Sequence, residues 1–253
     1  MAGDARDELY ESLLGADHER VTIGHLGQSL DGFIATHSGD SRYVNGRGNL
    51  LHLHRMRALC DVVVVGAGTV AADDPQLTTR LVPGPNPVRV VLDPERRLGG
   101  DYRVFTDRAA RTVLACREAL AYRQPMGGVE VLGVPGNAEG LDLAALLDAL
   151  HARGWTRVFV EGGGRTVSAF LAAGLLDRLQ LTVAPLIIGE GRPGIRLPAP
   201  DRLGDCRRPP HRAYRMGEDI LYDCDLMAGA CSAAPDEPAG AIVANDPPVI
   251  RVI

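Results

Sequence analysis

Asp61-Val-Val-Val-Val-Gly66-Ala-Gly-Thr-Val70 is the stretch that decides the fold of this 253-residue chain. An unbroken valine run is typical of a strand buried on both faces, as in a parallel sheet. The glycines that follow at once predict a tight corner, because glycine accepts backbone conformations that other residues avoid. A second stretch, Arg157-Val-Phe-Val-Glu161-Gly-Gly-Gly164, repeats this arrangement. Together they indicate a parallel α/β sheet with glycine corners at the ends of its strands.

Strand and helix patterns alternate on both sides of these stretches. Strands are expected at 21–26, 61–65, 88–92, 104–106, 112–115, 129–134, 157–160 and 179–188, the last broken at Pro185. Helices are expected at 45–60, 143–150 and 166–173, and residues 213–216 and 220–226 form a closing strand pair. We therefore expect an α/β fold with a mostly parallel central sheet, helices on both faces and antiparallel C-terminal strands.

No linker of low complexity divides the ordered elements, so we expect a single domain at 21–227. Residues 1–20 are predicted to be an N-terminal extension of helical character. Residues 228–253 are rich in alanine, proline and glycine and are predicted to be a mobile tail. The apolar end of that tail, 248–253, is either a frayed terminus or an edge strand added to a second copy.

Composition argues against several classes of protein. The net charge is −5 and no block of like charge occurs, which disfavours a nucleic-acid or membrane-surface partner. Residues 1–20 lack the basic start and apolar stretch of a signal peptide, so we do not expect them to be one, and no apolar run approaches the roughly 20 residues that span a membrane. The five cysteines form no Cys-x-x-Cys pair, and the histidines and the Asp73-Asp74 pair show no metal-ligand spacing. A cytoplasmic protein without a metal is expected.

The two glycine corners are candidate sites for phosphate. Where glycines follow a strand and lead into a helix, bare N–H groups and the helix dipole favour an anion. Two such corners suit the two halves of a dinucleotide. The usual dinucleotide fingerprint and the P-loop pattern are both missing, so a dinucleotide would bind on a different α/β scaffold. Structural glycines at a strand–helix corner would give the same pattern.

The motifs of the chain form one ordered set. It consists of Ser29-Leu-Asp-Gly32, Gly39-Asp-Ser41-Arg-Tyr43, Leu53-His-Arg-Met-Arg57-Ala, 61–70, Asp73-Asp-Pro-Gln-Leu77-Thr-Thr-Arg80, Pro87-Val-Arg-Val-Val-Leu-Asp93, Val160-Glu-Gly-Gly-Gly164 and Ala184-Pro-Leu-Ile-Ile-Gly189. Over 21–226 this set resembles the reductase domain of the riboflavin biosynthesis deaminase/reductase family, whose fold is like that of dihydrofolate reductase. The His-x-Glu and Pro-Cys-x-x-Cys motifs of the deaminase partner are not found in the sequence, so the resemblance is to the reductase standing alone.

The resemblance implies an activity and a set of site residues. The implied reaction is NADPH-dependent reduction of a phosphoribosylamino-pyrimidine to its ribitylamino form, of the 5-amino-6-(5-phosphoribosylamino)uracil reductase type, by a homodimer. Substrate contacts carry over to Ser41, Arg57, Leu77, Arg80 and Glu161. Cofactor contacts carry over to Gly27, Tyr43, Gly68, Thr69, Asp73, Gly162, Gly163, Gly164, Arg165 and Thr166. The pattern identifies no proton donor, and Tyr43 and Asn45 depart from the tryptophan and threonine usual at their positions.

Arginines beyond two strand ends favour NADPH over NADH, because a 2′-phosphate needs a cation. Arg96, Arg97 and Arg117 stand at these places, although ordinary surface arginines would look the same. Two other functions stay open. One is a paralogous reductase of another heterocyclic ribotide or a pterin-like ring. The other is a nucleotide-binding protein without catalysis, which the intact Ser41 and 161–164 corner disfavour.

Overall fold

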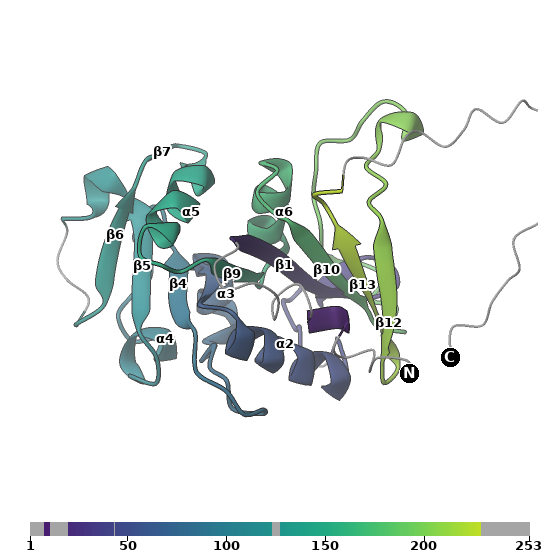
Figure 1. Cartoon of the computed structure of the whole chain (residues 1–253), viewed down its shortest axis with the longest axis horizontal. Coiled ribbons are helices and arrows are strands. Elements are labelled where there is room, and N and C mark those ends of the chain that lie inside the picture. Colours follow the sequence, from purple (N-terminus) through teal and green to yellow (C-terminus); the bar gives the residue numbers. More distant parts are fainter. Residues whose placement is uncertain (1–7, 11–19, 43, 123–126, 229–253) are drawn as a thin grey trace, which may run out of the picture.

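The computed structural model describes residues 8–10, 20–42, 44–122 and 127–228. Within this part of the chain, nine strands form one sheet in the order β12-β13-β10-β1-β9-β3-β4-β5-β6 (Figure 1). These strands are β1 (Val21–Gln28), β3 (Val62–Gly66), β4 (Val88–Leu92), β5 (Thr112–Arg117), β6 (Glu130–Val134), β9 (Arg157–Glu161), β10 (Arg178–Val183), β12 (His211–Met216) and β13 (Asp219–Asp225). The strands from β10 to β6 run parallel, and β13 and β12 add an antiparallel pair. The predicted fold class is confirmed.

Helices cover both faces of this sheet (Figure 1). One face carries α5 (Leu143–His151) and α6 (Gly164–Ala172), and the other carries α2 (Arg47–Leu59), α3 (Ala67–Asp73) and α4 (Arg103–Thr106). Smaller elements are the strand pairs β2 (Phe33–Thr36) with β11 (Gly191–Pro193) and β7 (Gly136–Asn137) with β8 (Gly140–Leu141), and the 3-10 turns η1 (Glu118–Leu120) and η2 (Leu203–Asp205).

The valine run of β3 connects the two cores. Val62 and Val64 pack in the core under α5 and α6, whereas Val63 and Val65 pack in the core under α2 and α3. Alternate residues of a strand point to opposite faces, so a strand covered on both faces is apolar throughout. All four valines are fully buried, as the sequence predicted.

Two of the predicted strands differ from the structure. The 104–106 segment is helix α4, because β4 pairs directly with β5 and leaves no place between them for another strand. The strand expected over 179–188 ends at Val183, two residues before Pro185, which has no N–H to donate to a ladder. The short pair β2 and β11 was not predicted.

Several predictions concern residues outside the described part of the chain. They include Tyr43, nearly all of the N-terminal extension and the tail from residue 229 onward. Within the extension, Glu8–Tyr10 are helical, and Leu9 and Tyr10 are buried against the core under α2.

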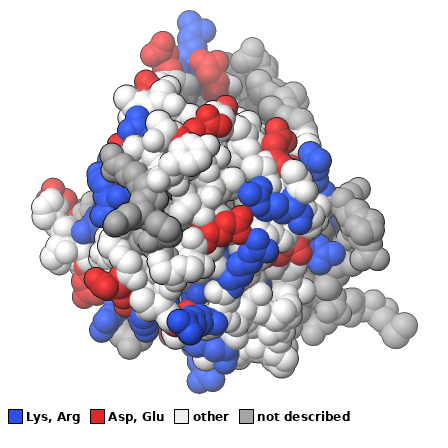
Figure 2. Space-filling model, turned by 90° about the vertical axis from the view of Figure 1, so that its left-hand side faces the viewer, with Lys and Arg blue, Asp and Glu red and all other residues white. Residues whose placement is uncertain are grey.

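Figure 2 shows the molecule from the β6 and α4 end of the sheet. Basic and acidic side chains are interspersed on this face, without one large basic patch. Among the described helices, none is long and apolar enough to cross a membrane.

Candidate functional site: a cleft at two glycine corners

The two glycine corners lie side by side, because β3 and β9 are neighbouring parallel strands. The Gly163 N–H donates a hydrogen bond to Thr69 Oγ1 at 3.0 Å. A Cβ atom on Gly66 would lie 2.5 Å from Thr166 Oγ1. Each corner therefore packs into the other, and the carboxyl ends of both strands open on the same side of the sheet.

A cleft of about 610 Å³ lies over these corners. Its lining includes Gly27, Ser41, Gly68, Thr69, Asp73, Gly162, Gly163, Gly164, Arg165 and Thr166 from the set that the resemblance implied. The 610 Å³ cleft is within the size range of small-molecule sites. The structure thus brings together every predicted cofactor residue that it describes.

The glycines of this cleft have different physical roles. Gly162 has φ +103°, a backbone conformation that disfavours a side chain. A Cβ atom on Gly164 would overlap the Gly194 carbonyl oxygen, and one on Gly27 would overlap Asn45 Oδ1. Gly27, Gly162 and Gly164 are therefore required by the local backbone and packing. Gly68 has no atom within 4 Å of its Cβ position, so a side chain there would extend into open space at the cleft.

The first turn of α6 presents donors to the cleft. Its N-cap is Gly163, and no side chain caps the helix. The first N–H groups of a helix have no partner within the helix, and they carry its positive dipole end. Gly164, Arg165 and Thr166 all line the cleft, so this positive end faces it.

The charge of the cleft favours an anion. Four arginines line it: Arg97, Arg165, Arg192 and Arg196. Within the described residues, none of the four forms an ion pair. The lining holds two carboxylates, Asp73 and Glu139. Burial raises the pKa of Asp73, while the Ser41 hydroxyl at 3.5 Å and Arg192 oppose this shift. The cleft thus offers guanidinium groups suited to phosphate oxygens.

Of the three arginines predicted to contact a 2′-phosphate, Arg97 reaches the cleft. Arg96 Nη1 donates to the Leu120 carbonyl oxygen at 3.2 Å. Arg117 forms an ion pair with Glu95. These contacts leave Arg97 as the member of the predicted group with access to a ligand in the cleft.

The predicted substrate residues divide into two groups. Ser41 lines the cleft, whereas Arg57, Leu77, Arg80 and Glu161 lie outside its lining. Arg57 and Glu161 form a buried bidentate ion pair: Nε donates to Oε2 at 2.8 Å and Nη2 donates to Oε1. Their side chains are 7% and 12% exposed. Much of the Arg57 guanidinium is therefore occupied within the protein.

Arg80 is exposed and lies near two other arginines, Arg57 and Arg103. Its Nη1 donates to Thr78 Oγ1 at 3.3 Å, and its main-chain N–H donates to His54 Nδ1 at 3.0 Å. Burial lowers the pKa of Arg80, and the nearby charges of Arg57 and Arg103 lower it further. Arg57 is paired with Glu161 and Arg103 with Asp74, so Arg80 is the guanidinium of this group that forms no ion pair within the described residues and can meet an anion.

Leu77 lies in the core beneath this group. Its side chain is buried, and its φ of +54° is unusual for a residue with a side chain. The structure thus places Leu77 in the packing that supports the loop.

The cleft lining also contains residues that sequence reasoning missed, among them His25, Arg192 and Arg196. His25 Nε2 lies 3.0 Å from Asn49 Oδ1 and 3.2 Å from Thr182 Oγ1. Burial lowers the pKa of His25 to about 4, so its ring is neutral near pH 7. The sequence feature that could have indicated Arg192 and Arg196 is the glycine-rich segment 189–196, which packs on β2 through β11.

Among the described residues, no three His, Cys, Asp or Glu side chains gather as a metal site.

Comparisons with known proteins identify the family of the chain. Residues 21–221 match the family model described as RibD C-terminal domain. The 2,5-diamino-6-ribosylamino-4(3H)-pyrimidinone 5′-phosphate reductase of Methanothermobacter thermautotrophicus is 35% identical over 207 residues, covering 79% of this chain and 95% of the relative. The riboflavin biosynthesis protein RibD of Aquifex aeolicus is 35% identical over 65% of this chain, and this match spans 46% of that protein.

Solved structures show the same architecture. A Thermotoga maritima diaminohydroxyphosphoribosylaminopyrimidine deaminase/5-amino-6-(5-phosphoribosylamino)uracil reductase matches 82% of this chain and 56% of its own, with a TM-score of 0.70 and 28% identity. The Saccharomyces cerevisiae riboflavin biosynthesis reductase Rib7 matches 88% of this chain and 99% of its own, with a TM-score of 0.68. At 18% identity, the yeast likeness concerns the fold alone.

Proposed function

The chain belongs to the RibD C-terminal domain family, and from this premise we propose that it is the NADPH-dependent reductase of a phosphoribosylamino-pyrimidine in riboflavin biosynthesis. The observation that carries the proposal is the cleft at the β3 and β9 corners. It combines an uncapped helix N-terminus with four arginines that have no ion-pair partner among the described residues. Both features suit the phosphates of a dinucleotide.

The reaction can be written in balanced steps. The ribosylamine opens when its C1′–ring-oxygen bond breaks, the amine nitrogen loses its proton, the ring oxygen takes up one proton and C1′ forms a double bond to nitrogen, which gives a neutral imine. When bound, the reduced nicotinamide supplies a hydride to C1′, and a proton added at nitrogen completes the ribitylamine. The chain contributes alignment of the two reactants and exclusion of water, which reduce the entropic part of the barrier.

Roles for this chain's own residues follow from their places. We assign the cofactor phosphates to the first turn of α6 at Gly163–Thr166, with Thr69 fixing the corner. We assign the substrate to Ser41 and to the cationic group around Arg80, with the Arg57–Glu161 pair supporting that group. Leu77 supports the loop from the core.

Gly68 offers a direct test of the cleft. Gly68→Leu is expected to weaken NADPH binding at least about tenfold, or about 1.4 kcal/mol. The new side chain would occupy the cleft, while the fold would keep its melting temperature, because nothing lies within 4 Å of the Cβ position and glycine is a poor helix former. The measurement is a fluorescence titration with NADPH. Gly204→Leu is the matched control, since Gly204 is equally open but lies outside the cleft lining.

Arg97 is expected to select the 2′-phosphate. The unmodified protein should bind NADPH at least about tenfold more tightly than NADH, and Arg97→Ala should bring the two affinities within a few-fold. Titration calorimetry with both cofactors measures the difference. Arg117→Ala is the control, because Arg117 is held by Glu95 and should keep the preference. Equal affinities in the unmodified protein would refute the choice of NADPH.

A homodimer and a cytoplasmic location stay predictions. An exposed apolar patch formed by Leu30, Leu186 and Ile187 supports the homodimer, because such patches commonly mark protein interfaces. The Leu30 N–H donates a main-chain hydrogen bond of 2.8 Å to the Leu186 carbonyl oxygen, so these residues lie next to each other.

A further inference from the structure

The loop from Asp74 to Arg80 is held by its main-chain carbonyl groups. Three arginines from three elements each donate to an alternate carbonyl oxygen: Arg103 Nε to Asp74 at 2.9 Å, Arg89 Nη1 to Gln76 at 3.1 Å and Arg57 Nη1 to Thr78 at 3.2 Å. These arginines belong to α4, β4 and α2. Arginine side chains thus connect the loop to three separate elements.

The backbone of this loop requires such ties. Asp74 has φ +39° and Leu77 has φ +54°, both in the left-handed region that residues with a Cβ avoid. Strained residues persist where the surrounding structure determines their conformation, and they concentrate at functional sites. The loop ends at Arg80, the cation to which we assign the substrate phosphate.

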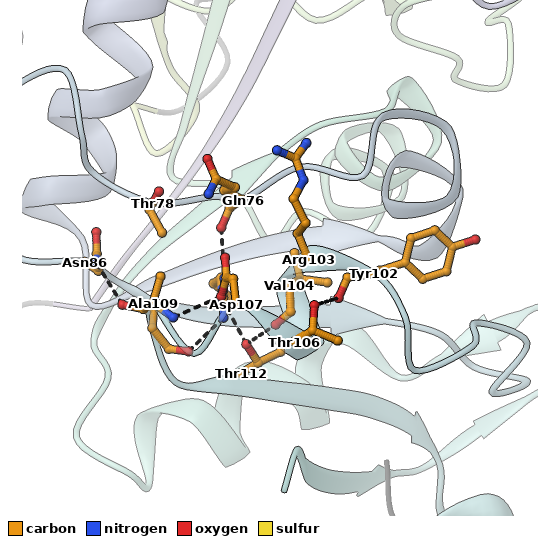
Figure 3. A network of polar contacts seen from close by, with 12 residues as sticks. Gln76, Thr78, Asn86, Tyr102, Arg103, Val104, Thr106, Asp107, Ala109 and Thr112 are labelled. Atoms are coloured by element: carbon orange, nitrogen blue, oxygen red, sulfur yellow. Dashed lines mark hydrogen bonds and ion pairs between the residues drawn. The ribbon is translucent and has the colours of Figure 1, made fainter. Parts of the chain in front are cut away.

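Arg89 binds the middle of the loop through the Gln76 carbonyl oxygen. It is almost fully buried, and it also donates to both carboxylate oxygens of Asp107, at 2.8 and 3.0 Å, and to Thr112 Oγ1 at 2.9 Å. Figure 3 shows Gln76 of the loop joined by a dashed line to this network, which contains Asp107 and Thr112. Because Arg89 belongs to the core, its removal would disturb the fold as well as the loop.

Arg103 holds the start of the loop and is half exposed. Its Nε contacts the Asp74 carbonyl oxygen at 2.9 Å and Asp74 Oδ2 at 3.0 Å, and its main-chain N–H donates to Asp74 Oδ1 at 2.7 Å. An ordinary surface ion pair contributes little to stability. The Arg103 side chain binds both the main-chain carbonyl and the carboxylate of Asp74, a residue with strained backbone. We therefore expect the loss of Arg103 to change the geometry of the loop rather than the stability of the fold.

We infer that Arg103 is a positioning residue that acts through the Asp74–Arg80 loop and sets the place of the Arg80 guanidinium for the substrate phosphate. The inference rests on the proposed function, because it takes Arg80 as the phosphate ligand. It assigns to α4 and to an arginine outside the cleft lining a part in substrate recognition.

The test compares Arg103→Ala with Arg111→Ala, a similarly exposed arginine whose surface ion pair with Glu130 lies away from the loop. Arg103→Ala is expected to raise KM for the phosphorylated substrate about tenfold, since misplacing an orienting group by ~1 Å can cost up to about a hundredfold. The value of kcat, the affinity for NADPH and the melting temperature should stay unchanged. Arg111→Ala should change none of these quantities.

Two further variants separate positioning from charge. Arg103→Lys keeps the charge but lacks the planar fork, so it should raise KM nearly as much as Arg103→Ala. Arg80→Ala combined with Arg103→Ala should have the KM of Arg80→Ala alone, because a residue that acts through Arg80 has no effect once Arg80 is removed.

Three results would overturn the inference: an unchanged KM for Arg103→Ala, full recovery by Arg103→Lys, or additive losses in the double variant. If Arg80→Ala shows the phosphate-dependent loss and Arg103→Ala does not, the positioning role fails and the proposed function stands. If Arg103→Ala raises KM and Arg80→Ala does not, the role of Arg80 in the proposed function fails together with the inference.

Discussion

Glu161→Ala is expected to destabilise the folded chain by about 3–5 kcal/mol, because it leaves the Arg57 guanidinium buried without its partner. Both side chains are almost excluded from solvent, and both terminal oxygens of Glu161 accept hydrogen bonds from Arg57. The measurement is the free energy of unfolding from a urea titration. For comparison, Glu95→Ala breaks the more exposed pair with Arg117 and should cost no more than about 1 kcal/mol.

The double variant Arg57→Met with Glu161→Leu serves as the second control. Replacing both members of a buried ion pair by apolar residues of similar size is often nearly neutral, so stability should largely return. Catalysis should not return, because Arg57 also donates to the Thr78 carbonyl oxygen in the loop before Arg80. A loss below about 1 kcal/mol for Glu161→Ala would show that the pair is not a buried anchor between α2 and β9.

Arg80→Ala is expected to lower kcat/KM for the phosphorylated substrate by roughly ten- to a hundredfold. The loss corresponds to about 1.5–3 kcal/mol, the usual contribution of a hydrogen bond to a charged group. With the dephosphorylated substrate the loss should nearly vanish, and the affinity for NADPH should stay unchanged, because Arg80 lies outside the cleft lining.

The comparison of the two substrate forms is the control for Arg80. If the guanidinium held the fold or the pyrimidine ring, both forms would lose activity equally. Such a result would remove the main support for a phosphoribosyl substrate, whereas a loss confined to the phosphorylated form would place the phosphate at Arg80.

Much of the fold could be predicted from the sequence because its signals are local. Short apolar runs that lead into glycines, the valine run of β3 and the Val-Phe-Val run of β9, identified both strands and their corners. Turn and helix signals gave the order of the remaining large elements. The 104–106 segment misled because three apolar or β-branched residues fit a strand or a helix equally, and the pairing of β4 with β5 decides between them.

The site was less predictable because it depends on contacts between distant residues. Arg57 and Glu161 are separated by 104 positions, and no local pattern indicates that they pair with each other. Arg192 and Arg196 reach the cleft through β11, a three-residue strand whose partner β2 was not predicted. The hydrogen bonds from Arg103 to Asp74 likewise depend on α4, most of which was predicted to be a strand at 104–106.

The most direct test of the proposed function is an assay of NADPH oxidation by the purified chain. Two substrates are compared side by side: 2,5-diamino-6-ribosylamino-4(3H)-pyrimidinone 5′-phosphate and its deaminated counterpart, 5-amino-6-(5-phosphoribosylamino)uracil. The account predicts loss of reduced-nicotinamide absorbance that requires at least one of these compounds and yields the ribitylamino product in equal amount. Folded protein that binds NADPH yet oxidises it no faster with either compound than without them would contradict the assignment as a reductase of this pathway.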